Sequence, residues 1–163
     1  MNGITVVETA LNSTEYLVNW FVGDLSDADL LVRPTAGANH LAWQLGHMIA
    51  SESRLVGQVP GMSAPKLPAG FEEQHAQGMA THESTQGFLG KQQYVELFAK
   101  VREATKAAVA KLSDADLDRP TEGQMAQFAP KLGDLLILVA NHTMMHAGQF
   151  SVVRRKLGKP VLF

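Results

Sequence analysis

Cysteine is absent from this chain of 163 residues. Its absence excludes disulfide bonds, thiolate metal sites and a cysteine nucleophile, and it is compatible with the reducing cytoplasm, where we expect the protein to be located. No apolar run approaches the roughly 20 residues that span a bilayer. The N-terminal segment carries Glu8 and Glu15 and lacks the basic start of a signal peptide. We therefore expect no membrane partner.

The chain also lacks an excess of positive charge, since its formal net charge is -2. A nucleic acid needs a basic face for its phosphates, so the composition argues against a nucleic-acid partner and leaves a small molecule. The dense basic run at 154–156 lies where a helix should end, and cations there complement the helix dipole. The length suits one hydrophobic core, and we expect residues 1–163 to form a single domain.

Period-two alternation, the pattern typical of half-buried strands, is missing as well. Apolar residues instead recur at spacings of three and four over four long segments. These spacings predict four helices, at about 4–22, 40–57 after a cap at Asn39, 91–112, and 131–157 before Gly158. The fold class that we predict is therefore all-α, and four amphipathic helices of this length form a four-helix bundle.

A near-repeat follows the first and the third of these helices. It reads LSDADLLVRPT at 25–35 and LSDADLDRPT at 112–121. In each copy the serine is a good N-cap with acidic residues in the first turn, and the proline discourages continuation of a helix. Both copies predict a short helical turn at the corner between two paired helices.

A long stretch rich in proline, glycine and small polar residues joins the second and third helices, at 58–90. Connections of this length are unusual in a compact domain. We expect a crossover that spans the bundle, so that the second and third helices run parallel. The same stretch is long enough to cover a site as a lid, and the sequence leaves this second role open.

Two histidines lie on the predicted inner face of the last helix. Its spacing of three and four passes through Leu132, Leu135, Val139, His142, His146, Gln149 and Val153. His142 and His146 are one turn and about 40° apart, so that their imidazoles can reach a common ion. Packed or solvated histidines are the simpler interpretation of such a pair. The predicted burial of the two histidines favours metal ligation. A buried polar group without a partner costs about 1–3 kcal/mol, and Gln149 can satisfy only one nitrogen.

A third ligand should come from a neighbouring helix, and His47 is the best candidate. It lies in the middle of the apolar second helix, after Gly46, a residue that costs about 1 kcal/mol relative to alanine inside a helix. A close approach between helices would explain this glycine. His40 is about 10 Å away along the helix and suits a cap or a cavity mouth. His75 and His82 fall in the long connection, either solvated or as lid residues.

These segments resemble a known family. The stretches NHLAWQLGHMIASE at 39–52 and NHTMMHAGQFSVVRRKLGKP at 141–160 are similar to motifs of the DinB-like, or DinB/YfiT-like, family of metal-dependent four-helix bundles. The helix order and the long connection agree, so the resemblance covers essentially the whole chain. Carried over residue by residue, it implies three metal ligands, at His47, His142 and His146.

The resemblance also implies a divalent ion, nickel or zinc, with positions left open for a substrate, and often a homodimer. Some relatives are transferases or isomerases that use a low-molecular-weight thiol such as bacillithiol, mycothiol or glutathione as cosubstrate. The predicted function is therefore a metal-dependent S-transferase acting on small electrophiles. A metal-dependent hydrolase, or a non-catalytic bundle that binds metal or a small ligand in a stress response, stays open as an alternative.

Catalytic residues are harder to predict. Glu52 points about 140° away from His47 and is a candidate base or indirect partner, against a surface position or an ion pair with Arg54. Gln149, one turn beyond His146, is a candidate for orienting a ligand or substrate. An H-E-x-x-H motif and paired E-x-x-H motifs are both lacking, which disfavours a zincin protease and a carboxylate di-iron bundle. Met144 and Met145 should pack on the back of the helix.

Overall fold

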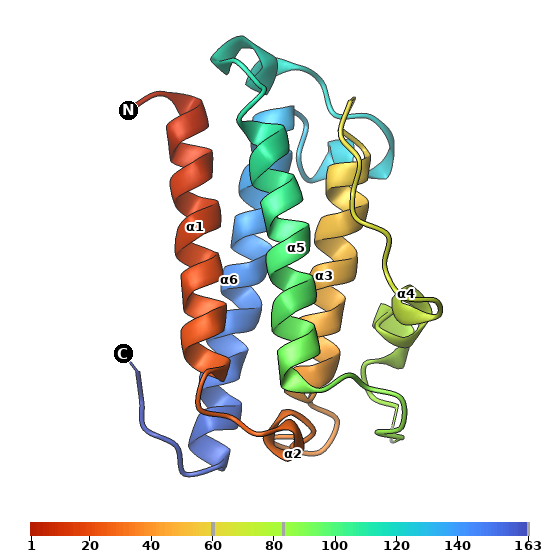
Figure 1. Ribbon diagram of the computed structural model, residues 1–163. Coiled ribbons are helices and arrows are strands. Elements are labelled where there is room, and N and C mark those ends of the chain that lie inside the picture. Colours follow the sequence, from red (N-terminus) through yellow and green to blue (C-terminus); the bar gives the residue numbers. More distant parts are fainter. Residues whose placement is uncertain (60, 83, 163) are drawn as a thin grey trace.

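In the computed structural model, which describes residues 1–59, 61–82 and 84–162, four long helices lie side by side (Figure 1). They are α1 (Gly3–Val22), α3 (Leu41–Gly57), α5 (Lys91–Val109) and α6 (Leu132–Lys156). α1 packs against α5 and α6, and α3 packs against the same two helices. No strand occurs among the described residues, so the predicted all-α bundle is confirmed. None of the described helices is both long enough and apolar enough to cross a membrane.

The connection at 58–90 descends along the outside of the bundle, so α3 and α5 run in the same direction, as predicted (Figure 1). Arg33 ties this connection to the rest of the chain, because its guanidinium donates to the carbonyls of Ala80, at 3.1 Å, and His82, at 2.7 Å. The connection contains two short helices, α4 (Phe71–Gln74) and the 3-10 turn η1 (Gln77–Met79).

Capping residues define where the long helices begin and end. Asn2 caps α1 through its side chain, and His40 caps α3 because its Nδ1 accepts a hydrogen bond from the N–H of Trp43 at 3.1 Å. The predicted cap at Asn39 is therefore wrong by one residue, and the capping role considered for His40 is correct. Gly158, at φ +69°, follows the end of α6 as predicted.

Each copy of the near-repeat forms the predicted turn, the first as α2 (Asp27–Leu30) and the second as the 3-10 turn η2 (Asp114–Asp118), which η3 (Gly123–Gln127) follows. The first aspartate of each copy also caps the start of a long helix. Asp27 accepts from the N–H of Lys91 in α5 at 2.7 Å, and Asp114 accepts from the N–H of Ile4 in α1 at 3.0 Å. Each corner therefore holds the start of a helix from the other half of the chain. Because the second copy begins at Leu112, α5 ends at Val109, earlier than predicted.

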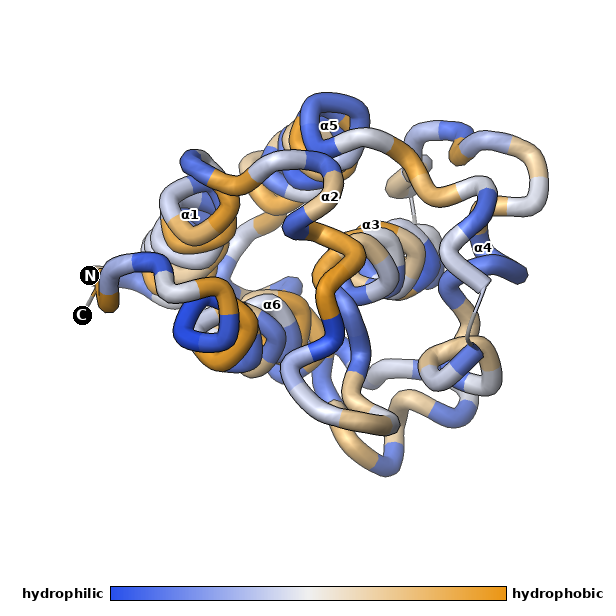
Figure 2. Tube along the Cα trace, turned by 90° about the horizontal axis from the view of Figure 1, so that it is seen from below, coloured by the Kyte–Doolittle hydropathy of each residue, from blue (hydrophilic) through white to orange (hydrophobic). Residues whose placement is uncertain are grey.

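A layer of buried polar side chains separates two apolar clusters in the bundle interior. Figure 2 looks along the bundle and shows the four long helices grouped around this interior. On each long helix the polar residue lies between a segment in one cluster and a segment in the other. We call this set the polar layer; its members are Thr14, Glu52, Arg102, Thr105 and Thr143.

Candidate metal centre

Three histidines from two helices meet beside the polar layer. His47 lies on α3, and His142 and His146 lie on α6. Their candidate ligand nitrogens are all within 4.8 Å of one another. The ring centroid of His47 is 5.2 Å from that of His142 and 5.4 Å from that of His146. The structure thus brings together the three histidines that the sequence singled out, and we call them the histidine cluster.

The helices hold these rings on one level of the bundle. The four-residue spacing of His142 and His146 puts their rings on one side of α6, with centroids 4.8 Å apart. On α3 the ring of Trp43, four residues before His47, stacks on its imidazole at 4.6 Å and 13°. Packing therefore restricts the orientation of the His47 ring before any ligand arrives.

Gln44 determines which nitrogen of His146 carries the proton. The amide nitrogen of Gln44 donates to the carbonyl of Asn39 at 3.1 Å, and this leaves the amide oxygen facing Nδ1 of His146, also at 3.1 Å. Because an amide oxygen can only accept, Nδ1 of His146 must carry the hydrogen. Its Nε2 is therefore an unprotonated lone pair.

A backbone carbonyl does the same for His47. Nδ1 of His47 lies 3.1 Å from the carbonyl oxygen of His75, which can only accept, so Nδ1 is again the protonated nitrogen. Nε2 of His47 is then bare. Nε2 of His146 lies 3.2 Å from Nε2 of His142. Two nitrogens of the cluster are therefore unprotonated, and Nε2 of His142 lies within hydrogen-bond distance of one of them. A free Nε2 on a ring whose Nδ1 donates a hydrogen bond is typical of metal-ligating histidines.

Burial keeps the whole cluster neutral. It lowers the pKa of His146 to about 3 and that of His142 to about 4, with smaller contributions from the neighbouring imidazoles. Burial also lowers the pKa of His47, against the hydrogen bond to the carbonyl of His75. Neutral imidazole is the form that binds a metal ion, so these three residues are in the right protonation state at neutral pH.

The donor set fits a divalent transition metal. It consists of three nitrogens, and imidazole suits zinc and nickel, whereas magnesium and calcium prefer oxygen. Around a tetrahedral ion with bonds of about 2.0–2.1 Å, two ligand nitrogens lie about 3.3 Å apart. The separation of 3.2 Å between the Nε2 atoms of His142 and His146 is close to that value.

Glu52 is buried, which excludes two of the positions that the sequence left open. It is neither on the surface nor paired with Arg54, because both of its oxygens accept from the buried guanidinium of Arg102, at 2.8–3.2 Å. One oxygen also accepts from the hydroxyl of Thr105 at 2.7 Å. The carboxylate of Glu52 is therefore bound to two side chains of α5. The sequence analysis did not identify either of these partners.

Gln149 is also placed differently from the prediction. It is exposed on α6, away from the buried face, and Phe150 takes the buried position instead. The residue that orients His146 is Gln44, on the other helix. Sequence analysis missed it, although Gln44 lies three residues before His47 and thus on a neighbouring part of the same helix face.

The remaining histidines have separate roles. His40 caps α3, and His82 is exposed in the connection. His75 is buried, so the prediction of a solvated loop residue is wrong for it. Its ring fills the space above Gly46, where an added Cβ would overlap it. The glycine therefore accommodates a side chain of the connection, not a neighbouring helix.

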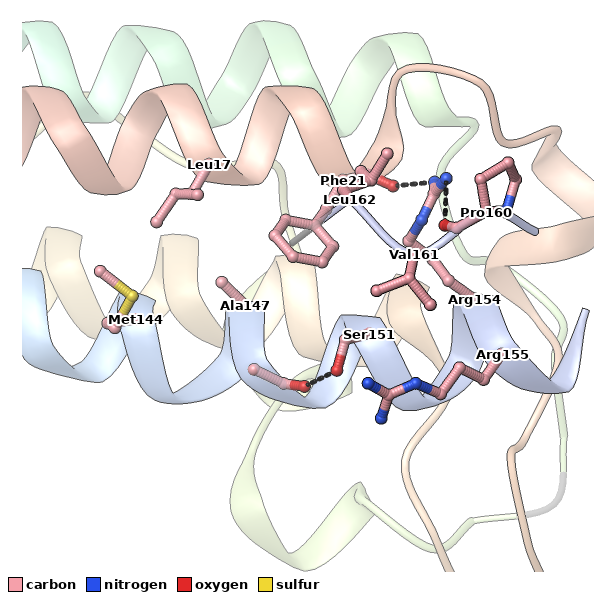
Figure 3. Close-up of a pocket in the computed structure, with 11 residues that line it drawn as sticks. Leu17, Phe21, Met144, Ala147, Ser151, Arg154, Arg155, Pro160, Val161 and Leu162 are labelled. Carbon is pink, nitrogen blue, oxygen red and sulfur yellow. Dashed lines mark hydrogen bonds between the residues drawn. The ribbon is translucent and has the colours of Figure 1, made fainter.

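Two cavities differ in their relation to the cluster. A cavity of about 380 Å³ adjoins it, with His47, Arg54, Glu72, Glu73 and His75 among its lining residues. A more apolar cavity of about 320 Å³ lies among α1, α6 and the C-terminal segment and includes none of the three histidines (Figure 3). The adjoining cavity is the one from which a small molecule would reach His47.

Arg154 borders this second cavity and corrects another expectation. The sequence placed it in a basic run that complements the end of a helix. In the structure Arg154 is buried and donates to the carbonyl of Phe21 at 2.7 Å (Figure 3). It also pairs with Asp24. Arg155 and Lys156 are exposed in the last turn, as expected. Met144 and Met145 are exposed as well, and Met144 lines this second cavity.

Fold and site together define an all-α bundle with a cluster of three neutral histidines between its second and fourth long helices. The chain belongs to the DinB superfamily, which matches residues 10–150. A crystal structure described as a conserved protein from Enterococcus faecalis has the same fold, with a TM-score of 0.71 over 98% of this chain and 99% of that one. Its sequence identity is 13%, so the likeness concerns the fold alone. No curated protein sequence matches the chain.

Proposed function

We propose that His47, His142 and His146 bind one divalent metal ion, with nickel and zinc as the expected metals. The observation that carries the proposal is the arrangement of lone pairs. Hydrogen bonds to Gln44 and to the carbonyl of His75 leave two Nε2 atoms unprotonated, inside a cluster whose nitrogens lie within 4.8 Å. A cation at their centre would accept these lone pairs directly, in place of the contact between the Nε2 atoms of His142 and His146.

We further propose that the protein is a metal-dependent S-transferase that joins a low-molecular-weight thiol to a small electrophile. A divalent ion bound by three neutral imidazoles keeps its full positive charge and lowers the pKa of a thiol or water beside it. The chain has no cysteine, so the thiol has to arrive as a cosubstrate. Membership of the DinB superfamily supports this chemistry, because the resemblance includes thiol-dependent transferases.

Thiol chemistry requires less help from a base than the hydrolase alternative, for which Glu72 and Glu73 in the adjoining cavity are the remaining carboxylates. Hydrolysis gains from a free carboxylate that takes a proton from water. Glu52, the carboxylate that the sequence suggested, is held by Arg102 and Thr105. A thiol ionises far more readily than water and needs less help from a base. Arg54, Glu72 and Glu73 line the adjoining cavity, where they would contact a substrate.

Metal analysis tests the first proposal. The purified protein should carry about one divalent ion per chain, and His146→Ala should release it. His82→Ala is the matched control, because His82 is an exposed histidine outside the cluster. Elemental analysis of the three proteins gives the result. Equal metal content in wild type and His146→Ala would refute the site.

A thiol screen tests the second proposal. The metal-loaded protein is mixed with bacillithiol, mycothiol or glutathione and a chlorodinitrobenzene as electrophile. Turnover with at least one thiol, abolished in His47→Ala, is the expected result. Tight metal binding without turnover for any thiol would support the non-catalytic alternative instead. The homodimer implied by the resemblance stays a prediction, as does the cytoplasmic location expected from the absence of cysteine.

A further inference from the structure

His75 is an unusual residue in the connection between α3 and α5. Most of the connection is exposed, yet His75 is 1% exposed and Phe71, one helical turn before it, is 3% exposed. Their rings pack against each other with centroids 4.2 Å apart. Together they anchor α4 to the side of the bundle that carries the histidine cluster.

Every polar atom of the His75 ring has a partner. Nδ1 lies 2.7 Å from the carbonyl oxygen of Phe71 and must donate to it, so Nε2 is the acceptor and receives the hydroxyl hydrogen of Tyr94 at 2.8 Å. The same hydroxyl oxygen accepts from the N–H of Leu89 at 3.4 Å. Burial raises the pKa of Tyr94, which keeps its hydroxyl protonated and able to donate. The ring is thereby held in one orientation.

The backbone of His75 reaches a residue of the histidine cluster. Its ring occupies the space that Gly46 leaves open on α3, and its carbonyl oxygen accepts from Nδ1 of His47 at 3.1 Å. Gly46 and His47 are adjacent in sequence. One loop residue therefore inserts its side chain beside α3 and places its carbonyl on the neighbouring imidazole.

We infer that His75 is a positioning residue for His47. By inserting beside Gly46, it holds its carbonyl on Nδ1 of His47 and sets the tautomer in which Nε2 is free. It also couples the order of the connection to the cluster, so that binding a metal at His47 stabilises the packing of α4. This inference deepens the proposed metal site, but its first consequence, the tautomer of His47, does not require a metal.

The test uses Gly46→Ala, which displaces the His75 ring and leaves all hydrogen-bonding groups in the chain. The control is Gly57→Ala in the same helix, where an added Cβ meets nothing within 4 Å. In metal-free wild type and Gly57→Ala, long-range ¹⁵N–¹H NMR should show His47 protonated on Nδ1. In Gly46→Ala it should show a tautomer mixture for His47, while Gln44 keeps His146 unchanged. An unchanged His47 tautomer in Gly46→Ala would overturn the inference.

Metal affinity and proteolysis supply further readouts. Loss of a partner that orients a ligand typically weakens binding about 10–100-fold, and we expect this loss for zinc in Gly46→Ala but not in Gly57→Ala. Protease cleavage within 61–82 should slow when zinc is added to wild type, and should not slow in Gly46→Ala. Equal zinc affinity and equal protection in both variants would also contradict the inference.

A second variant keeps the test decisive if Gly46→Ala does not fold. Tyr94→Phe removes only the hydroxyl that donates to His75, and it should shift the His47 tautomer in the same direction by a smaller amount. No shift in a folded Tyr94→Phe, together with a misfolded Gly46→Ala, would count against His75. If wild type binds no zinc at all, the metal proposal fails while the NMR result on the metal-free protein still decides the role of His75.

Discussion

The polar layer and the histidine cluster are two buried polar regions built by the same helices. α3 supplies Glu52 to one and His47 to the other, and α6 supplies the adjacent residues Thr143 and His142. In the polar layer, the members donate hydrogen bonds to and accept them from one another. The guanidinium of Arg102 donates to Glu52, Thr14, Thr143 and a backbone carbonyl, through all three of its nitrogens.

The histidine cluster is arranged in the opposite way. Its Nδ1 donors on His47 and His146 are satisfied at the periphery, which leaves the Nε2 lone pairs of these two rings without a proton. At the centre, Nε2 of His146 meets only another imidazole nitrogen, Nε2 of His142, at 3.2 Å. A buried polar group stabilises a fold when it is paired inside the chain, and it is a candidate for ligand binding when the chain leaves its lone pairs unmatched. This difference supports a structural role for the polar layer and the proposed binding role for the histidine cluster.

The largest effect should come from breaking the polar layer. Arg102→Met leaves the carboxylate of Glu52 buried without its partner, and we expect the free energy of unfolding to fall by about 3–5 kcal/mol. Urea denaturation measures this change. The double variant Arg102→Met/Glu52→Leu should recover most of the loss, because it removes the unpaired charge as well. A loss below about 1 kcal/mol in Arg102→Met would mean that Glu52 does not depend on Arg102 as its buried partner.

The second-largest effect should come from acidification, which lowers stability through the histidine cluster. Burial lowers the pKa of His146 to about 3 and that of His142 to about 4, below the 6.5 of an unperturbed histidine. The unfolded chain therefore binds more protons than the folded one as pH falls from 6.5, and the metal-free protein should lose stability through that window. Denaturant midpoints between pH 7 and pH 4 should fall more steeply for wild type than for His146→Gln. Parallel curves would contradict this contribution.

The smallest effect should come from the periphery of the cluster. Gln44→Leu removes the acceptor of the Nδ1 hydrogen of His146 and frees its tautomer. We expect zinc affinity to fall about 10–100-fold, while Gln149→Leu, at the exposed position that the sequence favoured, should leave affinity unchanged. Isothermal titration with zinc compares the two leucine variants. Equal zinc affinities of the two variants would mean that Gln44 does not orient His146 for metal binding.

Local patterns in the sequence predicted the helices and the three histidines, but not their partners. The spacing of His142 and His146 is a property of one helix and is readable from the chain. A strict spacing of three and four drifts by about 20° per heptad on a straight helix, so by the end of α6 the buried stripe has moved from Gln149 to Phe150.

The partners that the sequence missed come from distant segments. Glu52 meets Arg102 across 50 positions, and Gln44 meets His146 across 102, so no local periodicity reports either pair. The Ser-Asp-x-Asp corners show the same limit. Their own turns follow from capping preferences, whereas the bonds from Asp27 to α5 and from Asp114 to α1 depend on which helix start the fold brings close.

An anomalous-scattering map from crystals of the zinc- or nickel-loaded protein is the most direct test of the histidine cluster. We predict one strong peak between α3 and α6, about 2.0–2.1 Å from Nε2 of His47, His142 and His146. The absence of a peak there, or a peak whose ligands exclude His47, would contradict the assignment of this cluster as a metal centre.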